Sequence, residues 1–215
     1  MSRPYYIFFD LDGVLINGFH SNPDKTNRWD RNIEQDLGIK QEELTANFFE
    51  TSFMDVIIGK QDCKEALQEA LPSFSESVSA EQLMQYWFEK DSEFNQDVMA
   101  IVQALSELPE VKLYIATNQE HYRADFLWND AGLKNYFEDI YYSARLGCLK
   151  EDPDYFSQIV RELHLPDKNV LFFDDSPKNI DVAKQFGWDA VIFDDINDLA
   201  THPVINSLLL GKENS

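Results

Sequence analysis

The first pattern in the chain is an unbroken apolar run that ends in two acids. Residues 5–9 are Tyr-Tyr-Ile-Phe-Phe, and Asp10, Leu11, Asp12 and Gly13 follow. A continuous apolar run bounded by a turn residue is typical of a strand buried on both faces, as in a parallel sheet. Such a strand would place Asp10 at its carboxyl end, where open α/β sheets bind ligands. Two acids this close repel each other unless a cation lies between them or one is protonated, so this strand end predicts a catalytic or metal site.

Four later segments repeat the pattern of a short apolar run followed by polar residues. Two of them end in residues suited to phosphate or metal binding, Thr117 with Asn118 and Asp174 with Asp175. Helical patterns separate the segments, and alternating strands and helices predict a parallel, doubly wound sheet. The predicted strands are 111–116, 140–143, 169–173 and 190–193, and the predicted helices are 95–108, 122–131, 153–163, 176–186 and, as a terminal helix or docking tail, 204–210.

Residues 26–94 carry helical periodicity and no convincing strand. Thr26 would cap a first helix that Gly38 closes. Aromatic residues recur here at helical spacing, and we interpret them as helix packing rather than as a cofactor site. The spacing predicts three further helices, over 41–53, 60–71 and 79–94.

This helical block follows the first strand and is therefore an insertion into the α/β core. The core would then be discontinuous, built from both ends of the chain. We predict a catalytic core from residues 1–16 and 95–215 and an all-helical cap domain from residues 17–94.

Composition narrows the range of partners. The chain has 215 residues, with 18 basic and 39 acidic side chains and a net charge of −21. A field of that sign disfavours nucleic acid and anionic membrane surfaces as partners. Cys63 and Cys148 form neither a disulfide framework nor a metal cluster. With no signal peptide and no membrane-spanning run, the sequence predicts a cytoplasmic protein; it carries no signal for an oligomeric state.

Polar residues suited to phosphate chemistry recur in order along the predicted core. The segments FFDLDGVL, ATN, LKEDPDYF and FFDDSPKNI resemble the four signature motifs of the haloacid dehalogenase superfamily, in sequence order. The resemblance implies a Rossmann-like α/β core, Mg²⁺ dependence, and phosphoryl transfer through an aspartyl-phosphate intermediate. The helical insertion resembles the cap that many members carry after the first strand.

The motif residues have chemistry that fits the roles this resemblance implies. Asp10 would be the nucleophile, because a carboxylate that attacks phosphorus splits one difficult displacement into two easier ones. Asp12 would protonate the leaving group and then deprotonate the attacking water. Lys150 would supply positive charge beside Asp10. Thr117 would hydrogen-bond the transferring group.

The same resemblance predicts the metal and substrate contacts. Carboxylate oxygens suit Mg²⁺, and the expected ligands are Asp10, Asp174, Asp175 and the main-chain carbonyl of Asp12. Because Asp174 and Asp175 are adjacent, the sequence does not decide which of them binds the metal directly. We favour Asp175, with Asp174 assisting. The expected substrate-binding residues are Thr117, Asn118, Lys150 and Asn179.

Two other interpretations of the first motif do not fit the residues in and after it. A calcium-binding loop needs an oxygen ligand two residues after Asp12 and then a glycine, but Val14 and Leu15 occupy those positions. A dehalogenase expels halide, which needs neither a proton donor nor Mg²⁺, and dehalogenases of the superfamily lack the second aspartate. Asp12 therefore favours phosphate chemistry.

We predict a Mg²⁺-dependent phosphatase that acts on a small phosphorylated metabolite, with sugar phosphates as the leading candidates by resemblance. A phosphomutase like the β-phosphoglucomutases would share every core residue, and a non-catalytic protein of the same fold is a further alternative. In the cap, His20 and the pair Gly59-Lys60 are candidate substrate contacts. Glu151 departs from the family pattern, in which proline commonly follows the motif lysine. The Asp194-Asp195 pair resembles the fourth motif, but we expect it to be a turn at a strand end.

Overall fold

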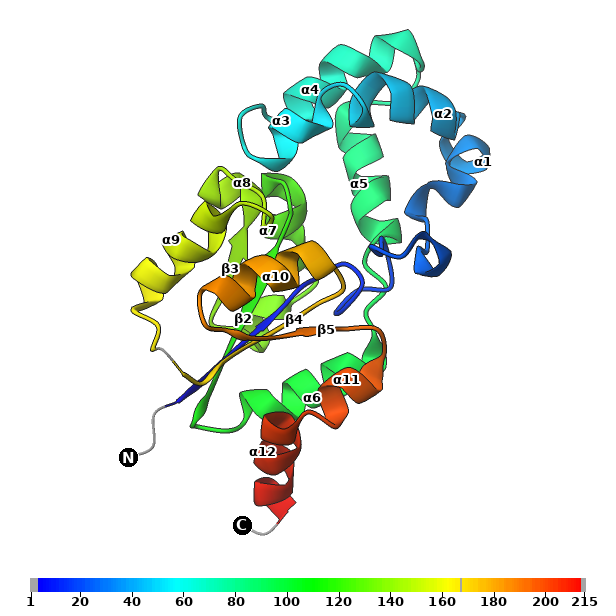
Figure 1. Ribbon diagram of the computed structural model, residues 1–215. Helices are drawn as coiled ribbons and strands as arrows, with labels where there is room; N and C mark the ends of the chain where they lie inside the picture. Colours follow the sequence, from blue (N-terminus) through cyan, green and yellow to red (C-terminus); the bar gives the residue numbers. More distant parts are fainter. Residues whose placement is uncertain (1–3, 167, 214–215) are drawn as a thin grey trace.

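The core is a five-stranded, all-parallel sheet in the order β3-β2-β1-β4-β5 (Figure 1). The computed structural model describes residues 4–166 and 168–213, so residues 1–3, 167 and 214–215 of the predicted core lie outside the described residues. The order confirms the predicted α/β, Rossmann-like sheet, with the first strand at its centre. The strands are β1 (Tyr5–Phe9), β2 (Val111–Thr117), β3 (Asp139–Tyr142), β4 (Val170–Asp174) and β5 (Asp189–Ile192).

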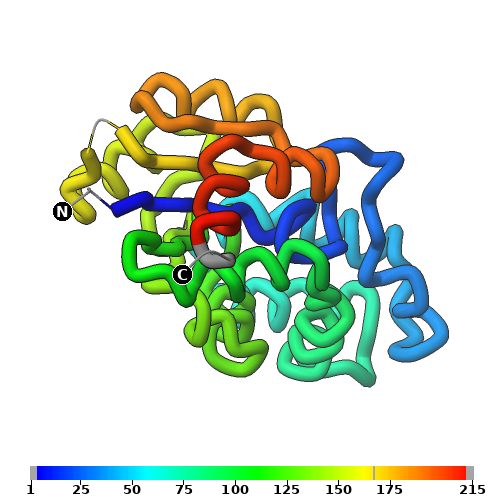
Figure 2. Tube along the Cα trace, turned by 90° about the horizontal axis from the view of Figure 1, so that it is seen from below, coloured from blue at the N-terminus to red at the C-terminus, as the bar shows by residue number. Residues whose placement is uncertain are grey.

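Helices cover both faces of the sheet because the central strands are apolar on both sides. Ile7 and Phe9 of β1 belong to one buried cluster, and Phe8 belongs to the other. Figure 2 shows the two layers of helices on either side of the strands. The first face is covered by α6 (Gln96–Ser106), α7 (His121–Asn129), α11 (Ile196–Ala200) and α12 (Pro203–Glu213), and the second by α9 (Pro153–Leu163) and α10 (Pro177–Gln185).

The core elements follow the predicted ranges closely, and two short helices were not predicted. These are α8 (Ser143–Leu146) and α11, which are too short to show a hydrophobic period. Asp195 caps α11, and Asp198 completes the capping box by bonding back to the main chain of Asp195. The Asp194-Asp195 pair is therefore a helix start rather than the simple turn that we expected.

The residues between β1 and α6 form helices around a hydrophobic cluster of their own, and none of the described residues among them forms a strand. In Figure 1 these helices stack beyond one edge of the sheet. The interpretation of residues 17–94 as a cap domain stays a prediction. The helices are α1 (Ile33–Leu37), α2 (Gln41–Leu44), α3 (Phe53–Ile57), α4 (Cys63–Ala70) and α5 (Ala80–Lys90), with a π-helical turn at Thr45–Phe49 and 3₁₀ turns at Pro23–Lys25, Trp29–Asn32 and Leu71–Ser73.

Two of the predicted cap helices were wrong in extent. Thr26 caps no α-helix, because its hydroxyl group bonds the main chain of His20 and holds a loop together. The helix that Gly38 closes begins only at Ile33. The predicted helix over 41–53 widens into the π-helical turn and restarts at Phe53. The rings of Phe48, Phe49 and Phe53 then lie within 5.8 Å of one another, centroid to centroid, in the hydrophobic cluster that these helices share.

The two connections between the core and the helical insertion run side by side. Ile16 and Phe94 form an antiparallel bridge, Asn17 N–H donates to the Glu93 carbonyl at 2.8 Å, and Asn95 N–H donates to the Leu15 carbonyl at 2.9 Å. The chain therefore leaves and re-enters the core at one place. None of the helices in residues 4–166 and 168–213 is long and apolar enough to cross a membrane.

The helical insertion also touches the core away from these connections. The Ser143 hydroxyl donates to the Ile57 carbonyl at 2.5 Å, and the Tyr122 hydroxyl donates to Asp62 at 2.9 Å. Gly59, at φ +71°, lies so close to α8 that a Cβ atom there would come within 2.4 Å of the Ala144 carbonyl oxygen. Only glycine fits both the left-handed backbone and this approach.

We predict that Gly59→Ala destabilises the protein more than Gly38→Ala. Both glycines have left-handed backbones, at φ +71° and +70°, so both substitutions carry a strain of about 1 kcal/mol. Only Gly59 adds a clash with backbone, which should remove a further 1–3 kcal/mol or so. Urea denaturation of the two variants and the wild type measures the difference. Equal losses would show that the approach to Ala144 carries no strain.

Candidate active site

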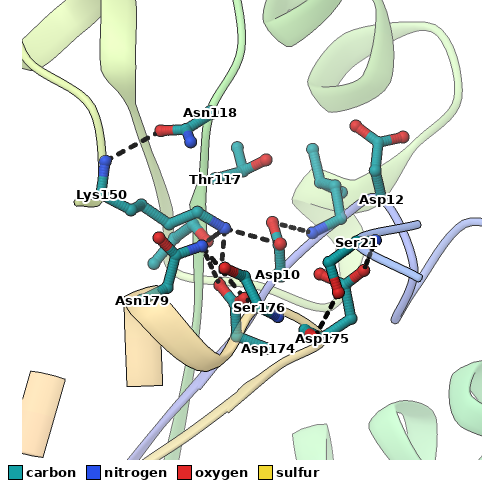
Figure 3. Close-up of polar contacts among 12 residues, drawn as sticks. Asp10, Asp12, Ser21, Thr117, Asn118, Lys150, Asp174, Asp175, Ser176 and Asn179 are labelled. Atoms are coloured by element: carbon teal, nitrogen blue, oxygen red, sulfur yellow. Dashed lines mark hydrogen bonds and ion pairs between the residues drawn. The ribbon is translucent and has the colours of Figure 1, made fainter. Parts of the chain in front are cut away.

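Three parallel strands bring the predicted motif residues together at one edge of the sheet. Asp10 directly follows β1, Thr117 ends β2, and Asp174 ends β4. The Asp10 N–H donates to the Phe173 carbonyl at 2.9 Å, which extends the pairing of β1 with β4 to the site. Figure 3 shows these side chains pointing toward a common centre with Lys150. The strand ends predicted from the apolar runs therefore meet as expected.

Lys150 is a buried cation shared between two buried acids. Its Nζ atom lies 2.6 Å from Asp10 Oδ2 and 2.7 Å from Asp174 Oδ2, and it also donates to the Ala116 carbonyl at 3.3 Å. Burial lowers the pKa of Lys150, but the carboxylates of Asp10 and Asp174 outweigh this and raise it. Lys150 therefore stays charged in the site.

The pKa of Asp10 is raised well above its usual value. Burial is the main cause, Lys150 opposes it, and the nearby carboxylates of Asp174 and Asp175 add to it. Burial also raises the pKa of Asp175, against a main-chain hydrogen bond from Ser21, and the charge of Asp174 adds to the increase. Both shifts arise because three carboxylates occupy one desolvated place. A bound cation would relieve this repulsion.

The two predicted asparagines hold the charged residues in place. Asn118 Oδ1 accepts the Lys150 N–H at 3.0 Å. The Asn179 amide nitrogen donates to both oxygens of Asp174 at 3.1 Å, and the Ser176 N–H donates to Asp174 Oδ1 at 2.8 Å. Their predicted substrate contacts stay predictions. Asn179 Oδ1 is buried and has no hydrogen-bond partner among the described residues.

Asp175 is held by a loop that sequence reasoning did not connect to the site. Ser21 N–H donates to Asp175 Oδ2 at 2.5 Å, and the Ser21 hydroxyl donates to the Asp175 carbonyl at 2.6 Å. His20 Nδ1 lies 3.3 Å from the same carboxylate oxygen, so this predicted substrate contact lies against an acid. Gly13, at φ +81°, has no room for a side chain, because a Cβ atom there would lie 2.6 Å from Asp175 Oδ2. Nothing in the local sequence around Ser21 indicated this contact.

Asp12 lies apart from Lys150 and Asp174, on the side of Asp10 away from them (Figure 3). Its carboxylate accepts from Arg123 Nη1 and Nη2, each at 2.9 Å, and from the Gln119 amide nitrogen at 2.5 Å. Sequence reasoning missed both donors. One feature of the sequence could have indicated Arg123: it lies four residues before Leu127, which places both on the same inward face of a helix.

The remaining predicted residues lie as follows. Thr117 is buried, and its carbonyl accepts the Tyr155 hydroxyl at 3.2 Å. Lys60 is 68% exposed and lies 3.9 Å from Asp55. Gly59 packs against α8, as described above. Glu151 pairs with Lys178 at the surface at 3.5 Å, so its charge is partly balanced.

The donor set fits a divalent cation. Carboxylate oxygens of Asp10, Asp174 and Asp175 all lie within 4.8 Å of one another, and all three residues are buried. Mg²⁺ prefers hard oxygen ligands of this kind. Lys150 balances one of the three negative charges, which leaves an excess that a divalent ion would neutralise. The residues present therefore suit Mg²⁺.

Glu120 caps α7 next to this site, and its pKa is raised as well. Its carboxylate accepts from the Tyr122 N–H at 2.8 Å and from the Arg123 N–H, and the side chain is buried. Burial raises the pKa of Glu120 to about 6, against these donors and the charge of Arg123. Its protonated form is therefore favoured more in the folded protein than in the unfolded chain.

A family model of haloacid dehalogenase-like hydrolases matches residues 6–187, which is most of the chain. A haloacid dehalogenase (HAD) family enzyme from Bacteroides thetaiotaomicron superposes with a TM-score of 0.71 at 20% identity, covering 92% of this chain and 98% of its own. The wild-type form of that enzyme, in complex with magnesium and inorganic phosphate, gives 0.67 at 19% identity, covering 88% and 93%.

The fold is shared with a halide-releasing relative as well. An L-2-haloacid dehalogenase from Xanthobacter autotrophicus superposes with a TM-score of 0.60 at 18% identity, covering 96% of this chain and 88% of its own. None of the curated proteins matches this chain. At these identities the solved structures establish the fold, and the chemistry must be argued from the site.

We predict that Glu120→Gln weakens the pH dependence of stability. The folded pKa of about 6 lies above the usual glutamate pKa of 4.5, so the contribution of Glu120 is present below about pH 4.5 and is lost as pH rises through about 6. The shift corresponds to about 2 kcal/mol. Urea denaturation at about pH 4.5 and about pH 6.5 should show a smaller difference for the variant than for the wild type. Comparing the differences cancels the weaker capping by glutamine, and identical differences would contradict the assignment.

Proposed function

The chain belongs to the haloacid dehalogenase-like hydrolases, and from this premise we propose that it is a Mg²⁺-dependent phosphatase of small phosphate monoesters. One observation carries the proposal. Three buried carboxylates lie together, two of them paired with one buried lysine, and a further aspartate lies apart from Lys150 and Asp174 on the other side of Asp10. This arrangement separates a site for attack on phosphorus from a site for proton transfer.

Asp10 is the proposed nucleophile. One of its oxygens accepts the Leu11 N–H at 2.7 Å and the other faces Lys150 at 2.6 Å, so the carboxylate is fixed in orientation. Attack on phosphorus would form an aspartyl-phosphate, and water would then cleave it. Two anions approach each other in this step, and Lys150 offsets part of their repulsion.

The metal contribution rests on the residues already described. Asp10, Asp175 and the main-chain carbonyl of Asp12 are the proposed ligands of Mg²⁺, which supplies charge neutralisation when bound. Asp174 already accepts from Lys150, Asn179 and the Ser176 main chain. We therefore assign Asp174 to holding Lys150 and assign Asp175 to the metal.

Asp12 carries the proton transfers in this proposal. It would protonate the leaving oxygen when the aspartyl-phosphate forms and would activate the water that hydrolyses it. Displacement of halide needs neither a proton donor nor a divalent cation, so Asp12 and the excess of acids favour the phosphatase over a dehalogenase. The contacts between cap and core favour a substrate small enough to lie between them.

The proposed partner is a small phosphorylated metabolite, and sugar phosphates are the first class to test. A net charge of −21 opposes nucleic acid and anionic membranes as partners. A product assay for isomerised sugar phosphate would separate hydrolysis from the phosphomutase reaction. Release of inorganic phosphate is the outcome that we expect.

We predict that the protein hydrolyses para-nitrophenyl phosphate only with Mg²⁺ and that Asp10→Asn lowers turnover by roughly a thousandfold or more. Asparagine keeps the shape of Asp10 but cannot attack phosphorus. Asp181→Asn, an exposed aspartate on α10, is the matched control and should keep wild-type activity. Full turnover in Asp10→Asn, or turnover that chelation of the metal leaves unchanged, would contradict the proposal.

We predict that Asp175→Asn weakens Mg²⁺ binding at least about tenfold, or about 1.4 kcal/mol. The variant replaces a charged metal ligand with a neutral one. Isothermal titration calorimetry with Mg²⁺ alone measures this without turnover. Asp194→Asn is the control, because Asp194 also lies just beyond a strand end, after β5, yet is 65% exposed and pairs with Lys25. Equal losses of affinity in both variants would reject Asp175 as the ligand.

A further inference from the structure

Arg123 is a buried arginine that the proposed chemistry does not use directly. Its side chain is 2% exposed, and it lies on the inward face of α7. A buried guanidinium group needs carboxylate partners, since its charge is otherwise expensive to desolvate. Burial lowers the pKa of Arg123, but the carboxylates of Asp12 and Asp91 outweigh this and raise it.

The first partner of Arg123 is Asp12. Nη1 donates to Asp12 Oδ2 and Nη2 donates to Asp12 Oδ1, both at 2.9 Å, in a bidentate pair that fixes both the position and the plane of the carboxylate. Gln119 adds a third bond, to Oδ2. Oδ1 accepts only the bond from Arg123 among the described side-chain contacts of Asp12, so it keeps a lone pair for a substrate proton.

The second partner is Asp91, in the connection that leads from the cap back to the core. Arg123 Nη2 donates to the Asp91 carbonyl at 2.7 Å and lies 3.2 Å from Asp91 Oδ2. Gly18, in the other connection, is so close that a Cβ atom there would lie 2.7 Å from Asp91 Oδ1 and 3.4 Å from Asp12 Oδ1. One guanidinium group therefore joins the first motif to the place where the cap is attached.

We propose that Arg123 is a positioning residue that orients Asp12 for proton transfer. Through its bonds to Asp91, it also couples the orientation of Asp12 to the connection between the core and the helical insertion. The inference rests on the proposed phosphatase function. Among the described residues, the Arg123 side chain bonds Asp12 and Asp91 and neither Asp10 nor Lys150, so it acts on the leaving-group side of the reaction. Its removal should slow the steps that need a proton from Asp12 more than those that do not.

The test compares two aryl phosphates of similar shape. At neutral pH nitrophenolate leaves without a proton, whereas phenolate, with a conjugate-acid pKa of about 10, benefits from one. For Arg123→Met and Arg123→Lys we expect kcat/KM to fall at least about tenfold further for phenyl phosphate than for para-nitrophenyl phosphate. Lysine keeps the charge but not the fork, so its effect should be the smaller of the two.

A double-mutant cycle separates positioning from general damage. In an Asp12→Asn background, Arg123→Lys should cause no further leaving-group-dependent loss, because the residue that it positions is already disabled. Arg145→Lys is the matched control, since Arg145 pairs with Asp139 and Glu162 away from the site, and it should leave both substrates unaffected. Gln119→Leu removes the other donor to Asp12, leaves the buried charge pair in place, and should show the same dependence at smaller size.

Failure of the positioning role of Arg123 and failure of the phosphatase function give different results. Equal losses on both substrates, in Arg123→Lys and in Gln119→Leu alike, would overturn the positioning role while leaving the phosphatase intact. Full additivity with Asp12→Asn would do the same. A wild-type protein that hydrolyses neither ester with Mg²⁺ would refute the proposed function, and the inference would fall with it.

Discussion

One buried ammonium group shared between two buried carboxylates organises the carboxyl edge of the sheet. Lys150 lies within 2.7 Å of both Asp10 and Asp174, and all three side chains are buried. Such a cluster is expensive to desolvate and holds together only when every charge has a partner. Asn118, Asn179 and the Ser176 main chain supply the remaining bonds. With Asp175 added, the acids still outnumber the lysine, and this unbalanced charge is the physical basis for expecting a divalent cation.

A second set of contacts relates this site to the inserted helices. The two connections run antiparallel at Ile16 and Phe94, and Arg123 bonds both Asp12, which precedes the first connection, and Asp91, which lies in the second. Ser21, just after the first connection, bonds Asp175. The start of the insertion therefore contacts Asp175, a proposed metal ligand. Its end contacts Arg123, which bonds the proposed general acid Asp12. Displacement of the insertion would therefore change the contacts that hold Asp175 and, through Arg123, Asp12.

The sequence was most informative where topology alone decides proximity. Parallel strands end at one edge, so the apolar runs before Asp10, Thr117 and Asp174 were enough to predict that these residues meet. Lys150 required the family resemblance, because nothing in its local pattern indicates a buried lysine. Ser21 and Arg123 were missed because their partners lie more than a hundred residues away in the chain. In the insertion, the broken helices around residues 26–38 and 41–53 depend on tertiary contacts of Thr26 and of the clustered phenylalanines, which periodicity does not contain.

The central claim is that Asp10 accepts a phosphoryl group, and the most direct measurement is to trap it. The protein would be mixed with Mg²⁺ and an excess of para-nitrophenyl phosphate, quenched in acid during turnover, and digested for mass spectrometry. We expect one added phosphoryl group on the peptide that contains Asp10, and none in the Asp10→Asn variant. Turnover with no such adduct, or an adduct on another residue that persists in Asp10→Asn, would contradict it.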